Sequence, residues 1–503
     1  MNQISNHNDN GGGAPVPIPA PRKKPAADPL PASAFKESHV TFQTADGTKS
    51  RGTLLRMTRL VASFEVYNPS VIPQLSEALD EFKIILHDRT AYAGRVVICN
   101  VMDAGTKVVC QATLNEAHWL DVDAAALAKC DDQLLVEFDS FLGEWQKLYK
   151  VFPEYENAIT KIEFFLTDLR LWLEKIESSL RSFPEVERLQ LERKMITKLS
   201  PRILPLIDSL FENFEKIAAR LDLDLRPIHR IYIQRRLHSI VLCAPFANRA
   251  YHKPLGYPGD YEMVNMMARD PQEGASMFAK IFNVWLHHQG SALAHRNRLA
   301  DLVKRIESEA LRLARKNGRA RIYNFACGPA IEVQNFLDQS ALGGKVEFTL
   351  TDFNAETLEY TANILARIKN RRGWRTPVQF QKINVNQLIK EDLVAAKKGV
   401  QPEYDFVYCA GLFDYLTDET CRKLIKIFYR RLAPGGLLYL TNVSPLTGNR
   451  GSLELILDWH LIYRDARQMK QLCSDLIPDE MVGVRTDETG INIFLEARKP
   501  HDP

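Results

Sequence analysis

One stretch, residues 321–352, constrains the fold of this chain more than any other. It reads RIYNFACGPAIEVQNFLDQSALGGKVEFTLTD: an apolar run, a turn of small residues, a segment with helical spacing, and a second apolar run that ends on Asp352. Strand, tight turn, helix, strand and acid is the order of one half of a nucleotide-binding α/β fold. In such a unit small residues let the backbone approach a ligand, and the acid is placed to accept hydrogen bonds from ribose hydroxyls.

The turn in this stretch is not a dinucleotide-binding fingerprint. That fingerprint, G-x-G-x-x-G, requires three glycines, and here only Gly328 occupies the turn. The segment resembles instead the first motif of class I S-adenosylmethionine (SAM)-dependent methyltransferases, in which an acid and then G-x-G-x-G follow the first strand. Asn324 takes the acidic position, and Ala326 and Ala330 replace the outer glycines. Because these three residues depart from the motif, the loop taken alone could also be an ordinary turn of an α/β fold with no cofactor.

Four later segments follow in the order and spacing of the same family. They read QFQKINV at 379–385, YDFVYCAG at 404–411, LAPGGLLYL at 432–440 and INIFLEA at 491–497. The first two are expected to be strands, the third a helix end, a turn and a strand, and the fourth a late strand. The sequence therefore predicts an α/β Rossmann-like methyltransferase domain over residues 291–500.

The resemblance implies a SAM site along the carboxyl ends of these strands. Asp352 would hold the ribose, the turn at Gly328 would pass beneath the methionine part, and Asn384-Val385 would contact the adenine. The residues expected to bind the cofactor are Asn324, Ala326, Cys327, Gly328, Asp352, Phe353, Asn384, Val385, Ala410 and Gly411.

Composition bounds the other parts of the chain. At 503 residues it is long enough for two or three domains, and its net charge of +3 shows no electrostatic footprint for nucleic acid. Eight cysteines are scattered without C-x-x-C or histidine spacing, which indicates buried thiols in a reducing compartment and no metal site. No apolar run has the length of a membrane span, and the N-terminus lacks a signal-peptide core. We therefore expect a cytoplasmic protein.

The first 115 residues divide into a tail and a small β domain. Residues 1–35 are rich in Gly, Pro and Ala, which predicts a disordered tail. Residues 36–115 contain six short β-branched segments separated by turns such as Asp46-Gly47, which predicts a six-stranded barrel or sandwich. The rhythm of these strands resembles a degenerate PilZ domain.

The motifs of this domain argue against binding of cyclic di-GMP. PilZ proteins that bind that nucleotide carry R-x-x-x-R and a later D/N-x-S-x-x-G. Here the second motif would fall on Arg56, Thr58 and Val61, and no arginine pair precedes it. Without paired arginines to stack on guanines and hold phosphates, an interaction or structural module is favoured.

Residues 116–245 are predicted to be helical. Apolar residues recur three and four apart between Phe138 and Phe152 and between Ile159 and Leu180. Helix starts are expected at Pro153, Pro184 and Ser200-Pro201. Long amphipathic hairpins of this kind often pair between subunits, so a homodimer through the helical domain is a hypothesis.

Residues 246–290 are expected to form a motif loop and a helical cap. The loop contains KPLGYPGDYE at 253–262, which is denser in aromatic and ionisable groups than a connector requires. It resembles the K-P-x-G-Y-x-G-D-Y-E segment of bacterial extracellular-factor 3-hydroxypalmitic acid methyl ester biosynthesis proteins, and the resemblance runs from about residue 130 to 500. What it implies is a SAM-dependent methyltransferase whose small-molecule substrate is a fatty-acyl carboxylate or a hydroxyl compound.

Methyl transfer from SAM needs an aligned nucleophile and exclusion of water. A carboxylate nucleophile is ionised at neutral pH, whereas a hydroxyl needs a base, for which His252, Asp260 and His460 are candidates. We expect Tyr257 and Asp260 to face the cofactor or the substrate, with Asp260 near the ammonium group of the cofactor. Residues 459–464 are either a cover over the substrate or a packed amphipathic helix.

A second function, of a different class, stays open. Because Asn324, Ala326 and Ala330 depart from the binding motif, the domain could be a catalytically idle SAM-fold regulator or scaffold with a PilZ-like interaction module. Asp352 and the loop at 257–260 favour the enzyme, since a scaffold has no need of them.

Overall fold

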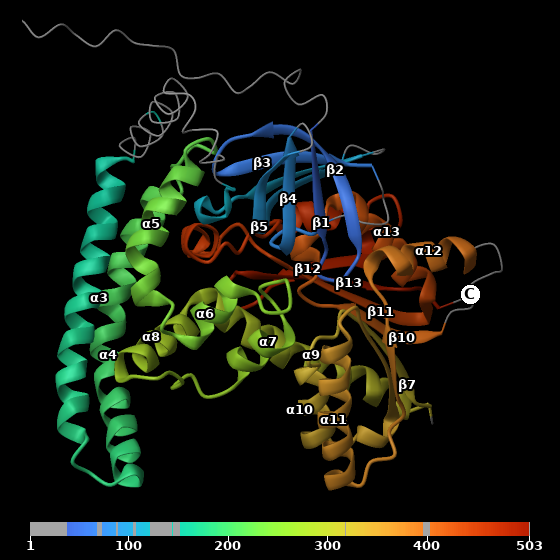
Figure 1. Cartoon of the computed structure of the whole chain (residues 1–503). Helices are drawn as coiled ribbons and strands as arrows, with labels where there is room; N and C mark the ends of the chain where they lie inside the picture. The colour runs from blue at the N-terminus through green and yellow to red at the C-terminus, as the bar shows by residue number, and fades with distance from the viewer. Residues whose placement is uncertain are drawn as a thin grey trace, which may run out of the picture.

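The chain is described as a computed structural model (Figure 1). The structure describes residues 38–67, 73–86, 89–103, 107–120, 143, 151–316, 318–395 and 403–501. The tail expected at 1–35 therefore lies outside the described residues. The described chain forms a β-barrel, a set of helices and an α/β domain, in that order.

The N-terminal part is a closed barrel of antiparallel strands in the order β1-β2-β3-β6-β5-β4. Its strands are β1 (His39–Gln43), β2 (Lys49–Met57), β3 (Val61–Val66), β4 (Ala78–Leu86), β5 (Arg89–Asp103) and β6 (Val108–Thr113). Alternate residues point inward, so the rings of Phe42, Phe64 and Phe82 meet in the interior, with centroids of neighbouring rings 5.6 and 5.5 Å apart. The predicted six-stranded barrel is confirmed, and its likeness to PilZ stays a prediction.

The middle of the chain is helical. Its helices are α3 (Pro153–Leu180), α4 (Glu185–Ala218), α5 (Arg226–Val241), α6 (Pro245–His252), α7 (Tyr261–Ala268), α8 (Met277–His288) and α9 (Gly290–Ala314). α3 and α4 form a long hairpin (Figure 1). The expected stripe on α3 is buried at Ile159, Ile162 and Leu166. On its other face Phe164 and Trp172 are exposed, and the homodimer stays a prediction.

The helix start expected at Ser200-Pro201 is wrong. α4 continues from Glu185 to Ala218 with Pro201 and Pro205 inside it, although an interior proline removes a backbone hydrogen bond and costs about 3 kcal/mol. Buried side chains of α4 share one core with α3 and α8, and each contributes about 1.5–3 kcal/mol on burial. Tertiary packing therefore outweighs the local break. The apolar residues expected between 138 and 148 lie outside the described residues.

The C-terminal part is a seven-stranded sheet in the order β12-β13-β11-β10-β7-β8-β9. Its strands are β7 (Ala320–Phe325), β8 (Val346–Asp352), β9 (Val378–Lys382), β10 (Tyr404–Cys409), β11 (Leu432–Val443), β12 (Val482–Thr486) and β13 (Asn492–Arg498). Its helices are α10 (Ile331–Gln339), α11 (Ala355–Arg372), α12 (Val385–Ala395), α13 (Asp418–Arg431) and α14 (Ala466–Gln471). The strands from β9 to β11 run parallel, and β13 is antiparallel to β11. β12 pairs antiparallel with β13 and therefore runs in the same direction as the other five strands. The expected strands are confirmed.

Three details of the sheet differ from the expectation. β12 has no counterpart in the sequence analysis. The Pro-Gly-Gly turn expected at 434–436 lies inside β11. Asn384-Val385 does not end β9 but leads into α12, which places both residues just beyond the carboxyl edge of the sheet.

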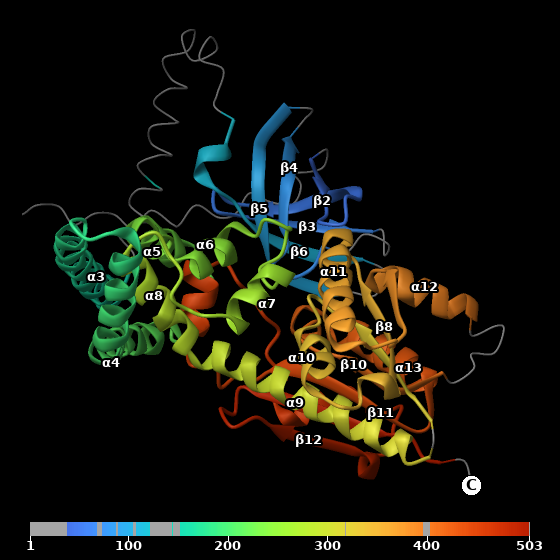
Figure 2. The ribbon, with the colours of Figure 1, turned by 90° about the horizontal axis from the view of Figure 1, so that it is seen from below.

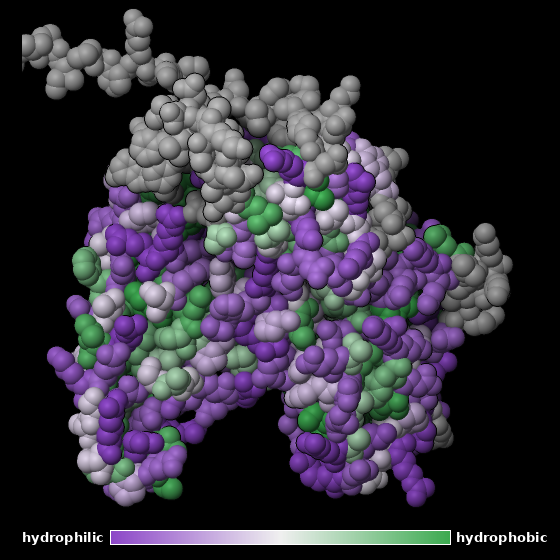
Figure 3. Space-filling model, viewed as in Figure 1, coloured by the Kyte–Doolittle hydropathy of each residue, from purple (hydrophilic) through white to green (hydrophobic). Residues whose placement is uncertain are grey.

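The barrel is joined to the rest of the chain at its rim. The backbone N–H of Ala78 donates to the carbonyl of Gly256 at 2.7 Å, and the Ser76 hydroxyl donates to the carbonyl of His460 at 2.9 Å. Figures 1 and 2 show the barrel lying over α7 and the end of the sheet near α12. The space-filling view shows a mostly hydrophilic face, hollowed between the helical hairpin and the α/β domain (Figure 3).

Three chemical features of the described residues bear on function. None of their helices combines the length and apolarity that crossing a bilayer requires. No three or more of their His, Cys, Asp and Glu side chains are grouped to hold a metal ion. Their cysteines are free thiols, buried except at Cys99, which is half-buried, and Cys243, which is exposed.

Candidate cofactor and substrate site

A cavity of about 480 Å³ lies at the carboxyl edge of the parallel strands. Its walls come from the sheet loops, α9, the loop before α7, the barrel rim and the helical part. All ten residues expected to bind the cofactor line it: Asn324, Ala326, Cys327, Gly328, Asp352, Phe353, Asn384, Val385, Ala410 and Gly411. The topology thus brings together residues spread over almost ninety positions of sequence, because parallel strands end at one edge.

The turn after β7 has the backbone of a glycine-rich loop although it contains one glycine. Ala326, Gly328 and Ala330 all have left-handed backbone angles, with φ of 58°, 52° and 49°. For each alanine that conformation costs roughly 1–2 kcal/mol. No heavy atom lies within 4 Å of the point that a Cβ of Gly328 would occupy. The turn is therefore a cradle that opens into the cavity, strained where a ligand can approach the backbone.

Asp352 joins this cradle to the second strand. Its Oδ2 accepts a hydrogen bond from the N–H of Gly328 and its Oδ1 from the N–H of Asn354, both at 3.0 Å. Burial raises the pKa of Asp352 to about 6, although these bonds favour the charged form. Because a carboxylate oxygen has two lone pairs, both oxygens can still accept a ribose hydroxyl.

Glu332 is an acid beside the end of the first strand, and the sequence analysis missed it. Its Oε1 accepts hydrogen bonds from Asn324 Nδ2 at 3.0 Å and from the Tyr408 hydroxyl at 2.7 Å. The side chain lines the cavity from the first turn of α10, and burial raises its pKa. An acid directly after a small-residue turn was the available signal.

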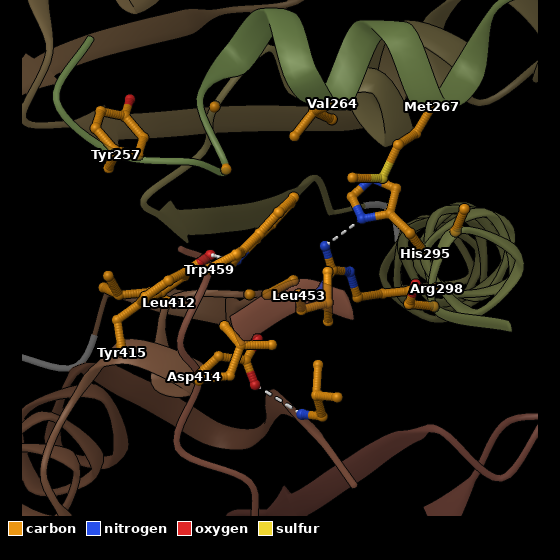
Figure 4. A pocket seen from close by; sticks show the side chains of 18 of the residues that line it. Tyr257, Val264, Met267, His295, Arg298, Leu412, Asp414, Tyr415, Leu453 and Trp459 are labelled. Carbon is orange, nitrogen blue, oxygen red and sulfur yellow. Dashed lines mark hydrogen bonds between the residues drawn. The ribbon is translucent and has the colours of Figure 1, made fainter. Parts of the chain in front are cut away.

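Arg298 on α9 is the single Arg or Lys among the described residues that line the cavity. It donates to His295 Nδ1 at 2.7 Å (Figure 4). Because an arginine only donates, this contact assigns the proton of the neutral imidazole to Nε2. Burial and then the charge of Arg298 hold the pKa of His295 well below its usual range. The pair therefore presents donors to an anionic group.

The loop before α7 reaches the cavity through Tyr257 and Gly259, and Tyr261 lines it from the first turn of α7. The Tyr257 ring packs 5.1 Å from that of Phe353, and burial, followed by the charge of Asp352, raises its pKa well above the ordinary value. Tyr257 therefore closes the cavity as a neutral phenol.

The expectation that the Asp260 carboxylate faces the cavity over Ala326 and Gly328 is wrong. Asp260 is 1% exposed and does not line the cavity. It caps α7 by accepting from the N–H of Met263 at 2.9 Å, and it is paired with Arg249, whose Nε lies 2.9 Å from Oδ1. The carboxylate thus orients the loop and is not available to a ligand.

Neither histidine proposed as a base lines the cavity. His252 is exposed, with Nδ1 2.9 Å from the carbonyl of Asn248. His460 is half-buried, and its backbone N–H donates to the Ser76 hydroxyl. Desolvation of the imidazole lowers its pKa to about 4. Of the segment at 459–464, which is not helical, Trp459 and Leu461 line the cavity.

Beyond the cofactor residues the cavity continues into an apolar lobe between α4, α6, α8 and residues 452–457. Its described walls include the apolar side chains Phe211, Val241, Phe246, Phe282, Trp285, Leu453, Ile456 and Leu457, and on the α4 side also the acids Asp208, Glu212 and Glu215. The junction between the two regions is formed by Tyr257, Tyr415 and Trp459, and Trp459 Nε1 donates to the Tyr415 hydroxyl at 2.9 Å (Figure 4). The lobe has the surface of a site for an apolar molecule.

Comparisons with known proteins found matches among solved structures. No protein-family model matches this chain, and no curated protein sequence does. A possible exported protein from Bordetella parapertussis is similar over 50% of this chain and 86% of its own, with 16% identity and a TM-score of 0.39.

Other similar structures are methyltransferases. Magnesium protoporphyrin IX methyltransferase from Synechocystis PCC 6803, with bound S-adenosylhomocysteine (SAH), matches 50% of this chain and 97% of its own, with 12% identity and a TM-score of 0.33. An O-methyltransferase family protein from Burkholderia thailandensis matches 56% and 75%, with 14% identity and a TM-score of 0.30. At these scores the likeness carries no functional argument.

Proposed function

We propose that this chain is a SAM-dependent methyltransferase that acts on a small molecule. The observation that carries the proposal is one cavity in which a left-handed cradle, an acid at the end of β8 and an apolar lobe are continuous. SAM, when bound, supplies a sulfonium methyl group that is already activated. Asp352 would hold its ribose, Asn384 and Val385 its adenine, and Gly328 would lie beneath its methionine part.

Two charged side chains suit the ends of the methionine part. Glu332 presents a carboxylate for the ammonium group, and Arg298 presents a guanidinium for a carboxylate. Arg298 is also close to Gly411, since a Cβ there would lie 3.1 Å from its Nη1. The donor set therefore fits a zwitterionic amino-acid end as well as a nucleoside.

The apolar lobe supports an acceptor with an extended apolar part, such as a fatty-acyl carboxylate or a hydroxyl compound. An acceptor carboxylate is ionised at neutral pH and needs no base. For a hydroxyl, the cavity offers Asp414, whose pKa burial raises to about 6. Tyr257, Tyr415 and Trp459 would exclude water from the junction where the methyl group is transferred.

Titration calorimetry with SAM and SAH tests the proposal. We expect both to bind, and failure of both to bind would overturn it. Transfer of labelled methyl from SAM to carboxylic acids and alcohols of increasing chain length then tests the acceptor. The rate of methyl transfer should rise with the length of the acceptor's alkyl chain if the apolar lobe holds that chain. A rate that does not depend on this length would mean that the lobe holds something else.

Glu332→Gln is expected to weaken SAM binding about fivefold, because it removes the charge but keeps the shape. Asp260→Asn is the matched control. It should leave the affinity within about twofold and lower the free energy of unfolding by roughly 1.5–3 kcal/mol, since it removes the charge that pairs with Arg249. Calorimetry and urea unfolding measure the two effects. If Asp260→Asn lost more affinity than Glu332→Gln, the acid that binds the ammonium group would be Asp260 and not Glu332.

SAH affinity is expected to be constant above about pH 7 and to fall below about pH 6. Asp352 has a pKa of about 6 in the free protein, and its ionised form is the better acceptor for ribose hydroxyls. Binding therefore favours the deprotonated state, and affinity is lost as the pH falls through 6. Calorimetry at pH 5.5, 6.5 and 7.5 measures this, and Asp352→Asn should weaken the dependence. Equal pH profiles for the wild type and Asp352→Asn would show that Asp352 is not the group that titrates on binding.

A further inference from the structure

We propose that the barrel takes part in cofactor binding: Asp46, at the tip of the β1–β2 turn, accepts a hydrogen bond from the exocyclic amino group of adenine. The proposal rests on the function proposed above. It assigns to the N-terminal domain a role in selecting the base of the cofactor.

The barrel rim is a wall of the same cavity. Thr44, Ala45 and Asp46 from the β1–β2 turn line it, and so do Gln74, Leu75 and Glu77 from the segment before β4. The rim meets the α/β domain beyond β9, where Asn384 leads into α12. In the proposed site this is the adenine end, because Asp352 holds the ribose one strand away.

The two carboxylate oxygens of Asp46 have different partners. Oδ1 holds the turn, accepting from the Thr44 hydroxyl at 2.6 Å and from the N–H of Thr48 at 3.1 Å. Oδ2 crosses the domain boundary and accepts from Asn384 Nδ2 at 3.1 Å. Although partial burial opposes ionisation, the hydrogen bonds outweigh it and lower the pKa of Asp46. At neutral pH the side chain is therefore an acceptor only, and Oδ2 has a second lone pair.

The position of Asp46 is held from the barrel side. The Glu77 carboxylate accepts from the N–H groups of Ala45 and Gln74, each at 2.6 Å, and so ties the two rim segments together. Gly256 fits directly beneath the turn, since a Cβ there would lie 2.6 Å from the Cβ of Ala45. The loop that closes the cavity is thereby docked on the rim, and Asp46 is presented to the adenine end in a defined place.

The chemistry of the base gives the proposal a sharp prediction. Adenine carries an amino donor at position 6, whereas hypoxanthine carries a carbonyl oxygen there. A carboxylate that accepts from the amino group would face that oxygen with no shared proton, which is unfavourable. The wild-type protein should therefore prefer SAH over S-inosyl-L-homocysteine, which differs from SAH in this group and in the proton that N1 of hypoxanthine carries.

The test is the ratio of the two affinities, measured by calorimetry on the full chain. We expect wild-type protein to bind SAH about tenfold or more tightly than the inosyl compound. In Asp46→Ala the ratio should fall about fivefold, and in Asp46→Asn further, because the amide can donate to the carbonyl oxygen. Glu81→Gln, which removes an exposed carboxylate of β4 outside the cavity, should leave the ratio unchanged.

A ratio of two ligands does not depend on the fraction of folded protein, so partial unfolding of a variant cannot imitate the effect. An unchanged ratio in both Asp46 variants, or equal affinities in the wild type, would overturn the role of Asp46 and leave the methyltransferase proposal standing. Failure of the wild type to bind either compound would instead overturn the methyltransferase proposal itself.

Discussion

Gly328→Val is expected to lower SAM and SAH affinity by more than about a hundredfold, beyond detection in a standard calorimetric titration. Gly328 has a φ of 52°, and the site of its absent Cβ is open space within the cavity. A valine would therefore meet no protein atom and project into the volume proposed for the methionine part of the cofactor. A β-branched side chain also disfavours the left-handed backbone, which would shift the cradle.

The chain offers a matched control for the backbone strain. Gly373, at the end of α11, has a φ of 68°, and it too has no heavy atom near its Cβ position, but it does not line the cavity. Gly373→Val should lower the free energy of unfolding by roughly 1–2 kcal/mol and leave SAM affinity unchanged. Cys327→Ser should also keep the affinity. If Gly328→Val still bound SAM, the cradle would not be the part of the cavity that holds the cofactor.

Asp352→Ala is expected to weaken SAM binding at least about tenfold. A carboxylate that accepts from two hydroxyls contributes roughly 1.5–3 kcal/mol through charge-assisted hydrogen bonds. The alanine also releases the N–H of Gly328, so the loss includes disorder of the cradle. Asp352→Asn keeps one acceptor for that N–H and should lie between wild type and alanine.

Calorimetry gives the affinities of the Asp352 variants, and thermal unfolding reports whether the cradle loosens. If Asp352→Ala bound SAM as wild type does, the ribose would have to lie elsewhere, and the assignment of adenine to Asn384 would go with it. If the alanine lost affinity and the asparagine did not, the role of Asp352 would be to hold the turn rather than the ribose.

Local pattern was sufficient to place the cradle and the sheet edge. The run 322–325, the small-residue turn and the helical spacing after it all lie within one short segment. Whether a segment forms a strand, a turn or a helix depends largely on residues that are close in sequence. Parallel strands then end at one edge, so Asp352, Asn384 and Gly411 could be assigned to one site before their distances were known. Ala326 and Ala330 replace glycines of the motif, but the backbone adopts the left-handed conformation at both of them.

Contacts between distant parts of the chain decided the rest. Asp260 pairs with Arg249, and the acid that lies beside Asn324 is Glu332, which comes from α10 and not from the end of a strand. α4 runs through Pro201 because its inner face is buried against α3 and α8.

The barrel enters the site through Asp46 and Asn384, which are 338 residues apart in the sequence. Periodicity shows which residues are apolar and how far apart they stand in the sequence. The sequence by itself therefore determined the place of the cradle and the order of the sheet strands other than β12. Which polar side chains form hydrogen bonds or ion pairs with each other depends on how the domains pack. That is why only the tertiary structure decided the acids of this site.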